Sequence, residues 1–451
     1  MKSIHYLKKA LPAVLAGTLL LTSACSNDKP EGSTAAENTN NGTPKSLKII
    51  MIADPWVDVM KNFGAEYEKA TGIKVQIDSY SYDQTHQKEV LLGTQKSDAA
   101  DVIVLDSPWI GEFAEGQITE DLKARIEATP DLEWDDYIPS FRQVAEWKGQ
   151  IVGVPFAPYY VMLHYRKDLF EKEGLQPPKT YDEMVAIAKR FTNNPNYPGM
   201  SGIAMNNAKG APAGQAWFEY IFNVDKPFES NYPGSKDAYA DMTPRIDSPE
   251  SIKIVNMFKE LLQYQPDGAL NFAWDDRTQA FAQGKVAMMA AWSVVTPGLL
   301  DPSRSQVSDK FATALVPGVS GKDPVAPLGG WVMSINKYSK NKEAAWDFIK
   351  WANNKENHKK FVLQGGPPSR LSELNDNEIK QKFHWIDTLA QSAEKAYADC
   401  RPRIPESFQI IDTIGNAISQ AVSGQMPVEQ AMKKANDDVK KLLIQSGYTF
   451  K

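Results

Sequence analysis

The sequence predicts an α/β protein of two lobes, and three observations support this prediction. The chain has 451 residues, which is enough for two ordinary domains with substantial cores. Short apolar runs alternate with segments in which apolar residues recur at helical spacing. This alternation is typical of a parallel sheet with crossover helices, and it occurs in both halves of the chain.

The first half shows strand, helix and strand in succession. Residues 47–53 are a short apolar run that predicts a buried strand. From Met60 to Ala70 apolar residues recur at helical spacing, and Gly72 ends the predicted helix. Residues 73–77 alternate as a second strand, and 102–105 form a fully apolar third strand. Right-handed crossovers between these strands would give a parallel sheet.

Polar and aromatic residues follow two of these strands. Asp54 and Trp56 come directly after the first strand, and Asp106 and Trp109 come directly after the third. Because ligands bind beyond the carboxyl ends of strands in such sheets, we expect these residues to lie at a ligand-facing edge.

The second half repeats the alternation. Residues 151–156 predict another strand, and Thr180 with Glu183 forms a capping box that opens a helix reaching Phe191. Pro427 and Gly447 bracket a long C-terminal helix. Apolar spacing predicts further helices at 344–351, 411–422 and 428–443.

The N-terminus predicts export and a lipid anchor. A basic head is followed by an apolar run from Ala10 to Leu21, too short to span a bilayer and typical of a signal peptide, here residues 1–24. Thr22-Ser23-Ala24-Cys25 resembles the lipobox of bacterial lipoproteins, which implies lipidation of Cys25, with Thr22 in place of the usual Leu. The alternative is secretory cleavage after Ala24 without a lipid. Residues 25–45 are almost free of apolar side chains and are expected to form a flexible tether.

Composition excludes several classes of function. The formal net charge is −6, so no basic surface predicts a nucleic-acid partner or a second membrane contact. The two cysteines leave Cys400 without a partner if Cys25 carries a lipid, so we expect no disulfide. The five histidines are scattered and show no metal-ligand spacing, so neither a metal nor a cofactor is expected.

Several short motifs in the mature chain resemble the extracellular solute-binding proteins of ATP-driven importers, in the branch that handles sugars. Each motif is weak alone, but their order along some 400 residues matches that family. The motifs are residues 63–75 (FGAEYEKATGIKV), 100–103 (ADVI, with Ala100 where the family has Pro), 153–156, 165–170, 174–175, 178–180, 280–288, Trp292 and 329–348.

The resemblance implies the two-lobe (type II) periplasmic-binding-protein fold, with discontinuous domains joined by a hinge. By analogy, the N-terminal lobe comprises residues 46–157 plus 334–371, and the C-terminal lobe comprises 158–333 plus 372–451. The hinge is expected near Ala157-Pro158 and Gly329-Gly330. The family also implies a monomeric, non-catalytic receptor on the outer face of the cell membrane. It would capture a carbohydrate, expected to be an oligosaccharide, and deliver it to the permease subunits of an ABC importer.

A sugar site needs aromatic faces for the C–H surface of the ring and polar groups for its hydroxyls. Residues that meet this requirement at strand ends or near the expected hinge are candidates for ligand binding. They are Asp54, Trp56, Asp106, Trp109, Tyr159, Tyr160, Trp292, Trp331, Arg401 and Arg403. For Trp109 and Trp331 we expect a loop or hinge position.

Other interpretations stay open. Four tryptophans on helical patterns are expected in the core: Trp217, Trp346, Trp351 and Trp385. Asp275-Asp276-Arg277 is expected to open a helix, which is a capping role, and the two arginines 401 and 403 could equally form a solvated surface pair. A secreted carbohydrate-active enzyme with a pair of acids, or a receptor of the same fold for a non-sugar solute, would also fit the sequence.

Overall fold

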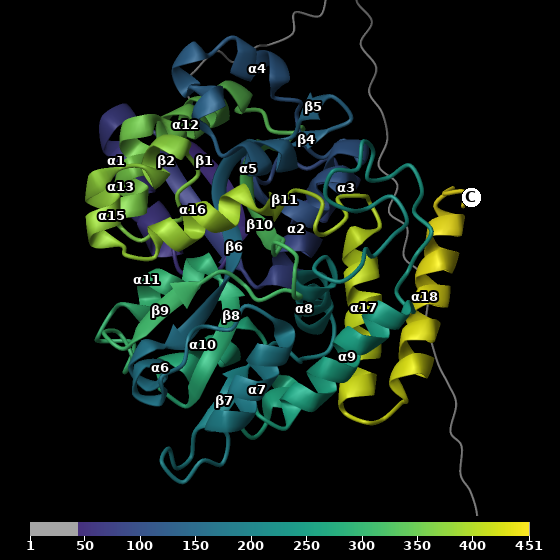
Figure 1. Cartoon of the computed structure of the whole chain (residues 1–451). Coiled ribbons are helices and arrows are strands. Elements are labelled where there is room, and N and C mark those ends of the chain that lie inside the picture. Colours follow the sequence, from purple (N-terminus) through teal and green to yellow (C-terminus); the bar gives the residue numbers. More distant parts are fainter. Residues whose placement is uncertain (1–43, 451) are drawn as a thin grey trace, which may run out of the picture. The chain divides into compact units, whose positions relative to one another are not determined.

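A computed structural model describes residues 44–450, which include all of the predicted secondary structure. The predicted signal peptide, Cys25 and nearly all of the tether lie outside the described residues. One mixed sheet runs through the structure in the order β2-β1-β3-β10-β6-β8-β7, with β9 beside β6 and β11 beside β10 (Figure 1). Its strands are β1 Ser46–Ile52, β2 Lys74–Tyr80, β3 Val102–Asp106, β6 Val154–Arg166, β7 Ser201–Ala204, β8 Val286–Trp292, β9 Phe311–Ala314, β10 Ala326–Ile335 and β11 Ala396–Tyr397, and a separate pair is formed by β4 Glu146–Trp147 and β5 Gln150–Ile151.

Helices cover both faces of this sheet. The α-helices are α1 Val57–Thr71, α2 Tyr82–Thr94, α3 Ile110–Glu115, α4 Lys123–Glu127, α5 Pro139–Val144, α6 Lys167–Glu173, α7 Tyr181–Phe191, α8 Ala211–Ile221, α9 Pro249–Leu262, α10 Trp274–Ala282, α11 Thr296–Leu299, α12 Lys342–Asn353, α13 Lys355–Leu363, α14 Leu371–Leu374, α15 Asn377–Lys382, α16 Ile386–Glu394, α17 Ser407–Val422 and α18 Val428–Gln445. Short 3-10 turns include η1 Ser107–Trp109 and η5 Ser293–Val295.

The parallel sheet predicted from the first half is confirmed, but the whole sheet is not parallel. Strand β1 pairs with β2 and with β3 in parallel register. In contrast, β10 pairs with β3 and β6 in antiparallel register, and β6 pairs with β8 and β9 in the same sense. Strand β10 enters the sheet more than 200 residues after β3, a non-local pairing that apolar spacing does not report.

Two long strands, β10 and β6, connect the part of the sheet formed by β1, β2 and β3 to the part formed by β7 and β8. The first residues of β6, up to Tyr160, pair with β10, whereas the residues from Val161 onward pair with β8 and β9. The strand predicted at 151–156 therefore begins later and continues to Arg166. Trp331 was expected in a loop or hinge, but it lies within β10, paired with both Asp106 and Ala157.

The helices form where local signals predicted them. Helix α1 ends at Gly72, which adopts the left-handed conformation that glycine favours. Helix α7 opens with the predicted capping box, in which Thr180 accepts from the Glu183 N–H and the Glu183 carboxylate accepts from the Thr180 N–H. Helices α12, α17 and α18 contain the three ranges predicted farther along the chain.

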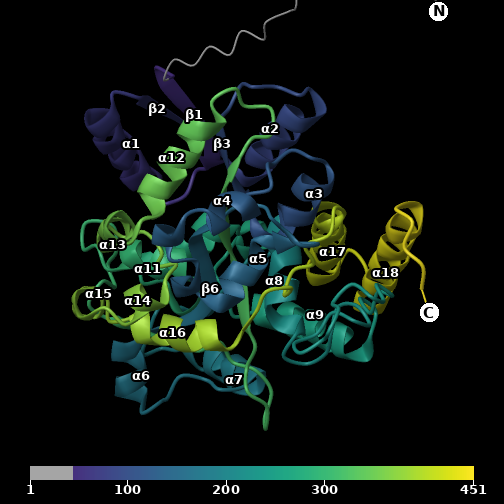
Figure 2. The ribbon, with the colours of Figure 1, turned by 90° about the horizontal axis from the view of Figure 1, so that it is seen from above.

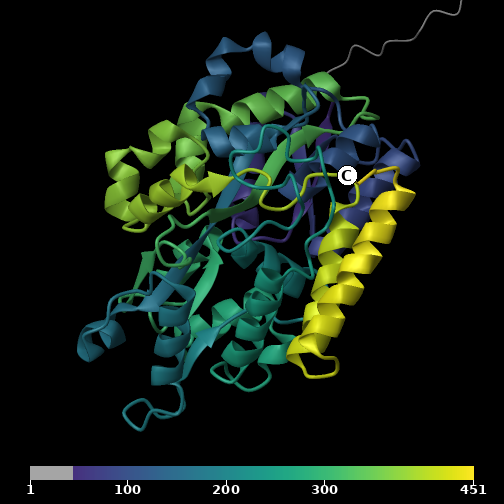
Figure 3. The same cartoon turned by 45° about the vertical axis from the view of Figure 1, so that its right-hand side comes forward.

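The two C-terminal helices pack side by side and close one flank of the fold. Helix α17 packs against α8, α9 and α18, and Figure 3 shows α17 and α18 running alongside one another. At the opposite flank, α12 lies close to α1 (Figure 2). There Trp351 is partly buried against Phe63 and Tyr67. The other tryptophans predicted for the core, Trp217, Trp346 and Trp385, are buried as expected.

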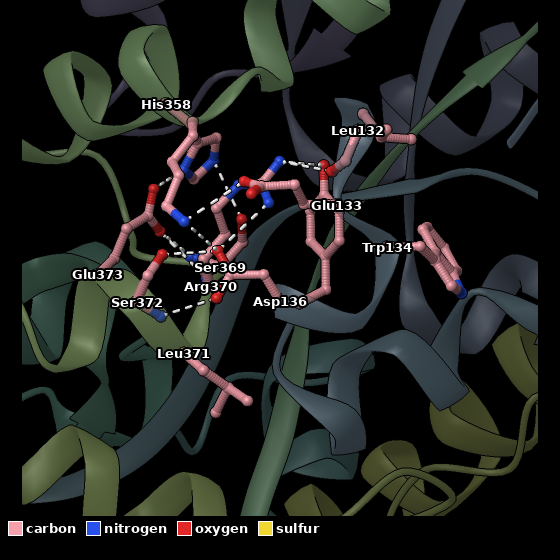
Figure 4. A network of polar contacts seen from close by, with 12 residues as sticks. Leu132, Glu133, Trp134, Asp136, His358, Ser369, Arg370, Leu371, Ser372 and Glu373 are labelled. Atoms are coloured by element: carbon pink, nitrogen blue, oxygen red, sulfur yellow. Dashed lines mark hydrogen bonds and ion pairs between the residues drawn. The ribbon is translucent and has the colours of Figure 1, made fainter. Parts of the chain in front are cut away.

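A buried polar network ties α13 and α14 to β6 (Figure 4). His358 bonds the Glu373 carboxylate through Nδ1 at 2.6 Å and approaches the Phe156 carbonyl oxygen through Nε2 at 3.0 Å. Arg370, fully buried beside them, donates to the carbonyl oxygens of Leu132 and Asn353 and to the Tyr137 hydroxyl. Most of the buried polar atoms of these residues therefore have partners, although Arg370 Nε and Asn353 Oδ1 have none among the described residues.

Among the described residues, none of the helices combines the length and the apolar character that crossing a bilayer requires. The same residues contain no group of three or more His, Cys, Asp or Glu side chains placed to hold a metal ion. Cys400 is buried and unpaired, with its Sγ against the backbone of Leu328.

Candidate ligand-binding site

A cavity of about 420 Å³ lies where β1, β3, β6, β8 and β10 meet the starts of α2 and α10. Strand ends and helix starts converge there because the loops that follow β1 and β3 leave the same edge of the sheet. The lining residues are Ile52, Ala53, Asp54, Pro55, Ser81, Tyr82, Asp106, Tyr159, Gln215, Ala273, Trp274, Asp275, Asp276, Arg277, Trp292, Val294, Val295, Gly329, Gly330, Trp331 and Arg401.

Six of the ten residues predicted to bind ligand line this cavity. They come from distant parts of the chain, and the fold brings them to one place. They are Asp54, Asp106, Tyr159, Trp292, Trp331 and Arg401. The ligand-binding role of all ten residues remains a prediction, but for these six the geometry permits direct contact.

Two of the predicted aromatic residues lie behind the cavity wall. Trp109 is fully buried in η1 and packs against Tyr82, His86 and Trp331, with ring centroids 4.9, 4.9 and 5.5 Å away. Trp56 is buried against Phe156. Both follow strands as the parallel-sheet rule requires, but their rings turn into the core.

The remaining two predicted residues also lie outside the cavity. Tyr160 follows Tyr159 in β6, so its side chain points to the opposite face of the strand, where it is fully buried near Ser140. Arg403 is 5% exposed; it pairs with Asp399 at 2.7 Å and donates to three backbone carbonyl groups. It is therefore neither a solvated surface residue nor part of the cavity lining.

An ion pair joins β3 to the C-terminal segment at the cavity. Arg401 donates to both carboxylate oxygens of Asp106, at 2.9 and 3.1 Å, and to the Ser107 hydroxyl at 2.7 Å. Tyr82 donates to the same carboxylate at 2.8 Å. Both charged side chains are almost completely buried, and in this bidentate pair each charge has the other as its counter-ion.

Asp54 differs because it forms no ion pair with any residue in the described part of the chain. Tyr159 donates its hydroxyl proton to the Asp54 carboxylate, and the Trp56 indole N–H donates to the Tyr159 oxygen. Burial raises the pKa of Asp54 to about 7, the Tyr159 hydrogen bond opposes that increase, and the nearby charges of Asp106 and Asp275 add to it. Asp54 can therefore accept or donate a hydrogen bond near neutral pH.

Two glycines allow the cavity wall to be assembled. A Cβ at Gly329 would lie 2.5 Å from the Arg401 guanidinium and 3.2 Å from the Trp292 ring. Gly330 has φ of +118°, and a Cβ there would lie 2.2 Å from the Ala157 carbonyl oxygen. Close approach of β10 to β6 and of Arg401 to Trp292, whose ring lies 5.4 Å from the guanidinium carbon, depends on these two positions.

The prediction from sequence missed several lining residues. Tyr82 and Trp274 are both partly exposed to the cavity, with ring centroids 5.6 Å apart. Tyr82 opens α2 just beyond the second predicted strand, so the strand-end rule could have identified it. Trp274 opens α10 and carried no such signal.

The helix-opening role predicted for residues 275–277 is confirmed for one of them. The Asp276 carboxylate accepts from the Ala273 N–H at 3.0 Å at the start of α10. Arg277 is instead buried at the cavity wall. Gln215, in α8, lies on the same wall and was not predicted.

This architecture matches known solute-binding proteins. An ABC transporter solute-binding protein from Agrobacterium radiobacter K84, solved in complex with ribitol, has 31% sequence identity and a TM-score of 0.83, and the match covers 89% of this chain and 100% of that one. A mannitol-binding protein of Pseudomonas aeruginosa is 26% identical over 338 residues, 70% of this chain and 75% of the relative.

A further relative comes from Sinorhizobium fredii and is named "Probable amino-acid ABC transporter periplasmic-binding protein y4oP". It is 27% identical over 401 residues, 87% of this chain and 88% of the relative. These similarities confirm the two-lobe fold predicted from the sequence motifs. The model of the bacterial extracellular solute-binding proteins matches residues 53–359. With more than half of its length matched, this chain belongs to the family of bacterial extracellular solute-binding proteins, which bind a solute for an importer and are not enzymes.

Proposed function

We propose that this protein captures a neutral sugar or polyol in the cavity between β1, β3, β10 and α10 and delivers it to the permease of an ABC importer. The observation that carries the proposal is the cavity lining itself. Tyr82, Trp274 and Trp331 offer ring surface for the C–H groups of a sugar, and Asp54 offers a hydrogen-bonding carboxyl group. The ribitol complex and the mannitol-binding relative support this class of ligand.

Capture would occur by closure of two lobes around the ligand. The proposed lobes are residues 46–157 plus 334–371 and residues 158–333 plus 372–451. Strands β6 and β10 would cross between them near Ala157-Pro158 and Gly329-Gly330, where the two strands pair with one another. Closure forms no covalent bond to the ligand. The ligand can therefore be released to the permease when the two lobes reopen.

The protein would act at the outer face of the cell membrane as a lipid-anchored monomer. A lipid on Cys25 and the tether to residue 45 would hold the receptor close to its permease and raise their effective concentration. The length of the carbohydrate, expected from the sequence to be that of an oligosaccharide, remains a prediction.

The amino-acid name of the Sinorhizobium relative supports a second candidate, a receptor for an amino acid. An amino acid would place its ammonium group on a carboxylate and its carboxylate on an arginine, and the cavity offers Asp54 and Arg277. A neutral sugar or polyol should bind if the protein is a sugar receptor and should not bind if it is an amino-acid receptor.

A thermal-shift screen against ribitol, D-mannitol, maltose and the common L-amino acids tests the proposal. We expect at least one neutral sugar or polyol to raise Tm, because binding to the folded state alone stabilises it by mass action. Chromatography of the mixtures should show the added sugar unchanged. A rise with amino acids alone, or conversion of the sugar to products, would contradict the proposal.

A further inference from the structure

Five arginines in the described part of the chain are buried, and one of them differs from the others. Arg166 forms two hydrogen bonds with Asp168, and Arg370, Arg401 and Arg403 each donate several hydrogen bonds at short distance. Arg277 is 2% exposed, yet its guanidinium makes no hydrogen bond to any described residue. Because Arg277 lines the cavity, its five N–H donors are available to a ligand or to ordered water there.

Among the described residues, the one ion pair of Arg277 compensates its charge weakly. Glu219 Oε2 lies 4.0 Å from Arg277 Nη1, beyond hydrogen-bond distance, and Glu219 Oε1 has no partner. Burial raises the pKa of Glu219 to about 7, although the charges of Arg277 and Arg401 oppose the increase. Near neutral pH this carboxyl group is therefore only partly ionised, and Arg277 keeps most of its capacity to bind another acceptor.

A second unsatisfied donor lies beside the same wall. Gln215 precedes Glu219 by four residues, so both side chains lie on one face of α8. Gln215 is 3% exposed, it lines the cavity, and its Nε2 has no hydrogen-bond partner among the described residues. Two buried and unpaired donor side chains thus come from different helices, α8 and α10, to one cavity wall.

We infer that Arg277 and Gln215 form a donor subsite that binds adjacent hydroxyl groups at one end of the sugar or polyol. This inference rests on the proposed function and adds the residues that discriminate between ligands. The planar guanidinium fork can donate to two neighbouring oxygens at once, which suits a vicinal diol. Asp54, on a different strand, supplies the complementary carboxyl group in the same cavity.

The ligand oxygens are hydroxyl groups, not a carboxylate. Asp275 and Asp276 line the same cavity as Arg277. A ligand carboxylate would therefore meet two acidic side chains in the same cavity, whereas a hydroxyl group can accept from Arg277 without that repulsion.

Titration calorimetry with ribitol, D-mannitol and maltose on purified wild-type protein and variants tests the subsite. We expect Arg277→Gln to weaken binding of the ligand that the wild type prefers by about tenfold to a hundredfold, because a charge-assisted hydrogen bond is lost. Arg277→Lys should recover part of this loss, since it keeps the charge but not the fork. Gln215→Leu should weaken binding less than Arg277→Gln does. If the Arg277 variants do not fold, the affinity of Gln215→Leu alone tests the subsite.

Arg370→Gln is the matched control, because Arg370 is equally buried but all its bonds lie in the network of Figure 4, outside the cavity. It should lower Tm and leave the affinity unchanged. Wild-type affinity in folded Arg277→Gln and Gln215→Leu would overturn the subsite while the proposed function stands. Tighter binding of D-ribonate than of ribitol, lost in Arg277→Gln, would overturn the hydroxyl assignment. No binding of any neutral sugar to the wild type would instead contradict the proposed function.

Discussion

The hydroxyl group of Tyr159 donates a hydrogen bond to the carboxylate of Asp54, 105 residues away in the sequence. Tyr159 lies in β6 and Asp54 follows β1, so this bond connects two strands of the sheet that are not neighbours. It also holds a cavity-lining carboxyl group whose pKa burial raises to about 7. The consequences of that environment can be measured.

Asp54 should make the stability of the ligand-free protein depend on pH. Its pKa is about 7 in the folded protein and near 3.8 when unfolded, so the folded state binds more protons between these values. The free energy of unfolding should therefore fall as pH rises from about 4 to about 7, by at most about 1.4 kcal/mol per pH unit. Urea unfolding of wild type and Asp54→Asn across this range measures the difference. Parallel curves for the two proteins would show that Asp54 has an ordinary pKa.

The cavity-lining Trp274 and the buried Trp109 should respond differently to truncation. Trp274→Ala should lower sugar affinity by about 1.5–3 kcal/mol, or roughly tenfold to a hundredfold, because the sugar loses a ring surface. Its Tm without ligand should change little, since Trp274 is partly exposed. Trp109→Ala should cost about 3–5 kcal/mol of stability. Calorimetry and thermal unfolding of both variants check this, and a stable Trp109→Ala protein with lost affinity would reverse the assignment.

The Asp106–Arg401 pair should contribute to stability mainly as a unit. Asp106→Asn leaves the Arg401 guanidinium buried without its counter-ion, which should cost about 3–5 kcal/mol. Arg401→Met should have a similar cost, and the double variant should cost clearly less than the two together. A double-mutant cycle of urea unfolding gives the coupling energy. Additive effects would mean that the two charges do not stabilise one another.

Cys25 should anchor the protein to the membrane. In Cys25→Ser the acceptor for the lipid is lost, so we expect release into the medium or retention of the unprocessed precursor. Radiolabelled palmitate and fractionation of cells measure both effects. A correctly trimmed Cys25→Ser protein that stays at the membrane would contradict the lipobox.

Ligand binding should bring the two proposed lobes together. Solution X-ray scattering should then show a smaller radius of gyration at saturating ligand than without ligand. The hinge is expected near Ala157-Pro158 and Gly329-Gly330, where β6 and β10 lie side by side. An unchanged profile, with binding shown by calorimetry on the same sample, would contradict capture by closure.

The sequence by itself determined the elements whose signals are local. Apolar spacing, the capping box of Thr180 and Glu183, and Gly72 act within one or two helical turns, so α1, α7 and the C-terminal helices could be predicted. The strand-end rule also identified Asp54 and Asp106, because it depends on the direction of β1 and β3 alone. The order of short motifs was sufficient to predict the family.

Only the tertiary structure decided which side chains share the cavity. Asp106 meets Arg401 across 295 residues, and Arg277 lies on one wall with Gln215 because α8 and α10 converge there. Antiparallel entry of β10 and the inward turn of Trp109 also depend on contacts between distant segments. The physical reason is that burial and pairing are set by the whole packed fold, whereas the sequence pattern reports only the preference of each segment for helix or strand.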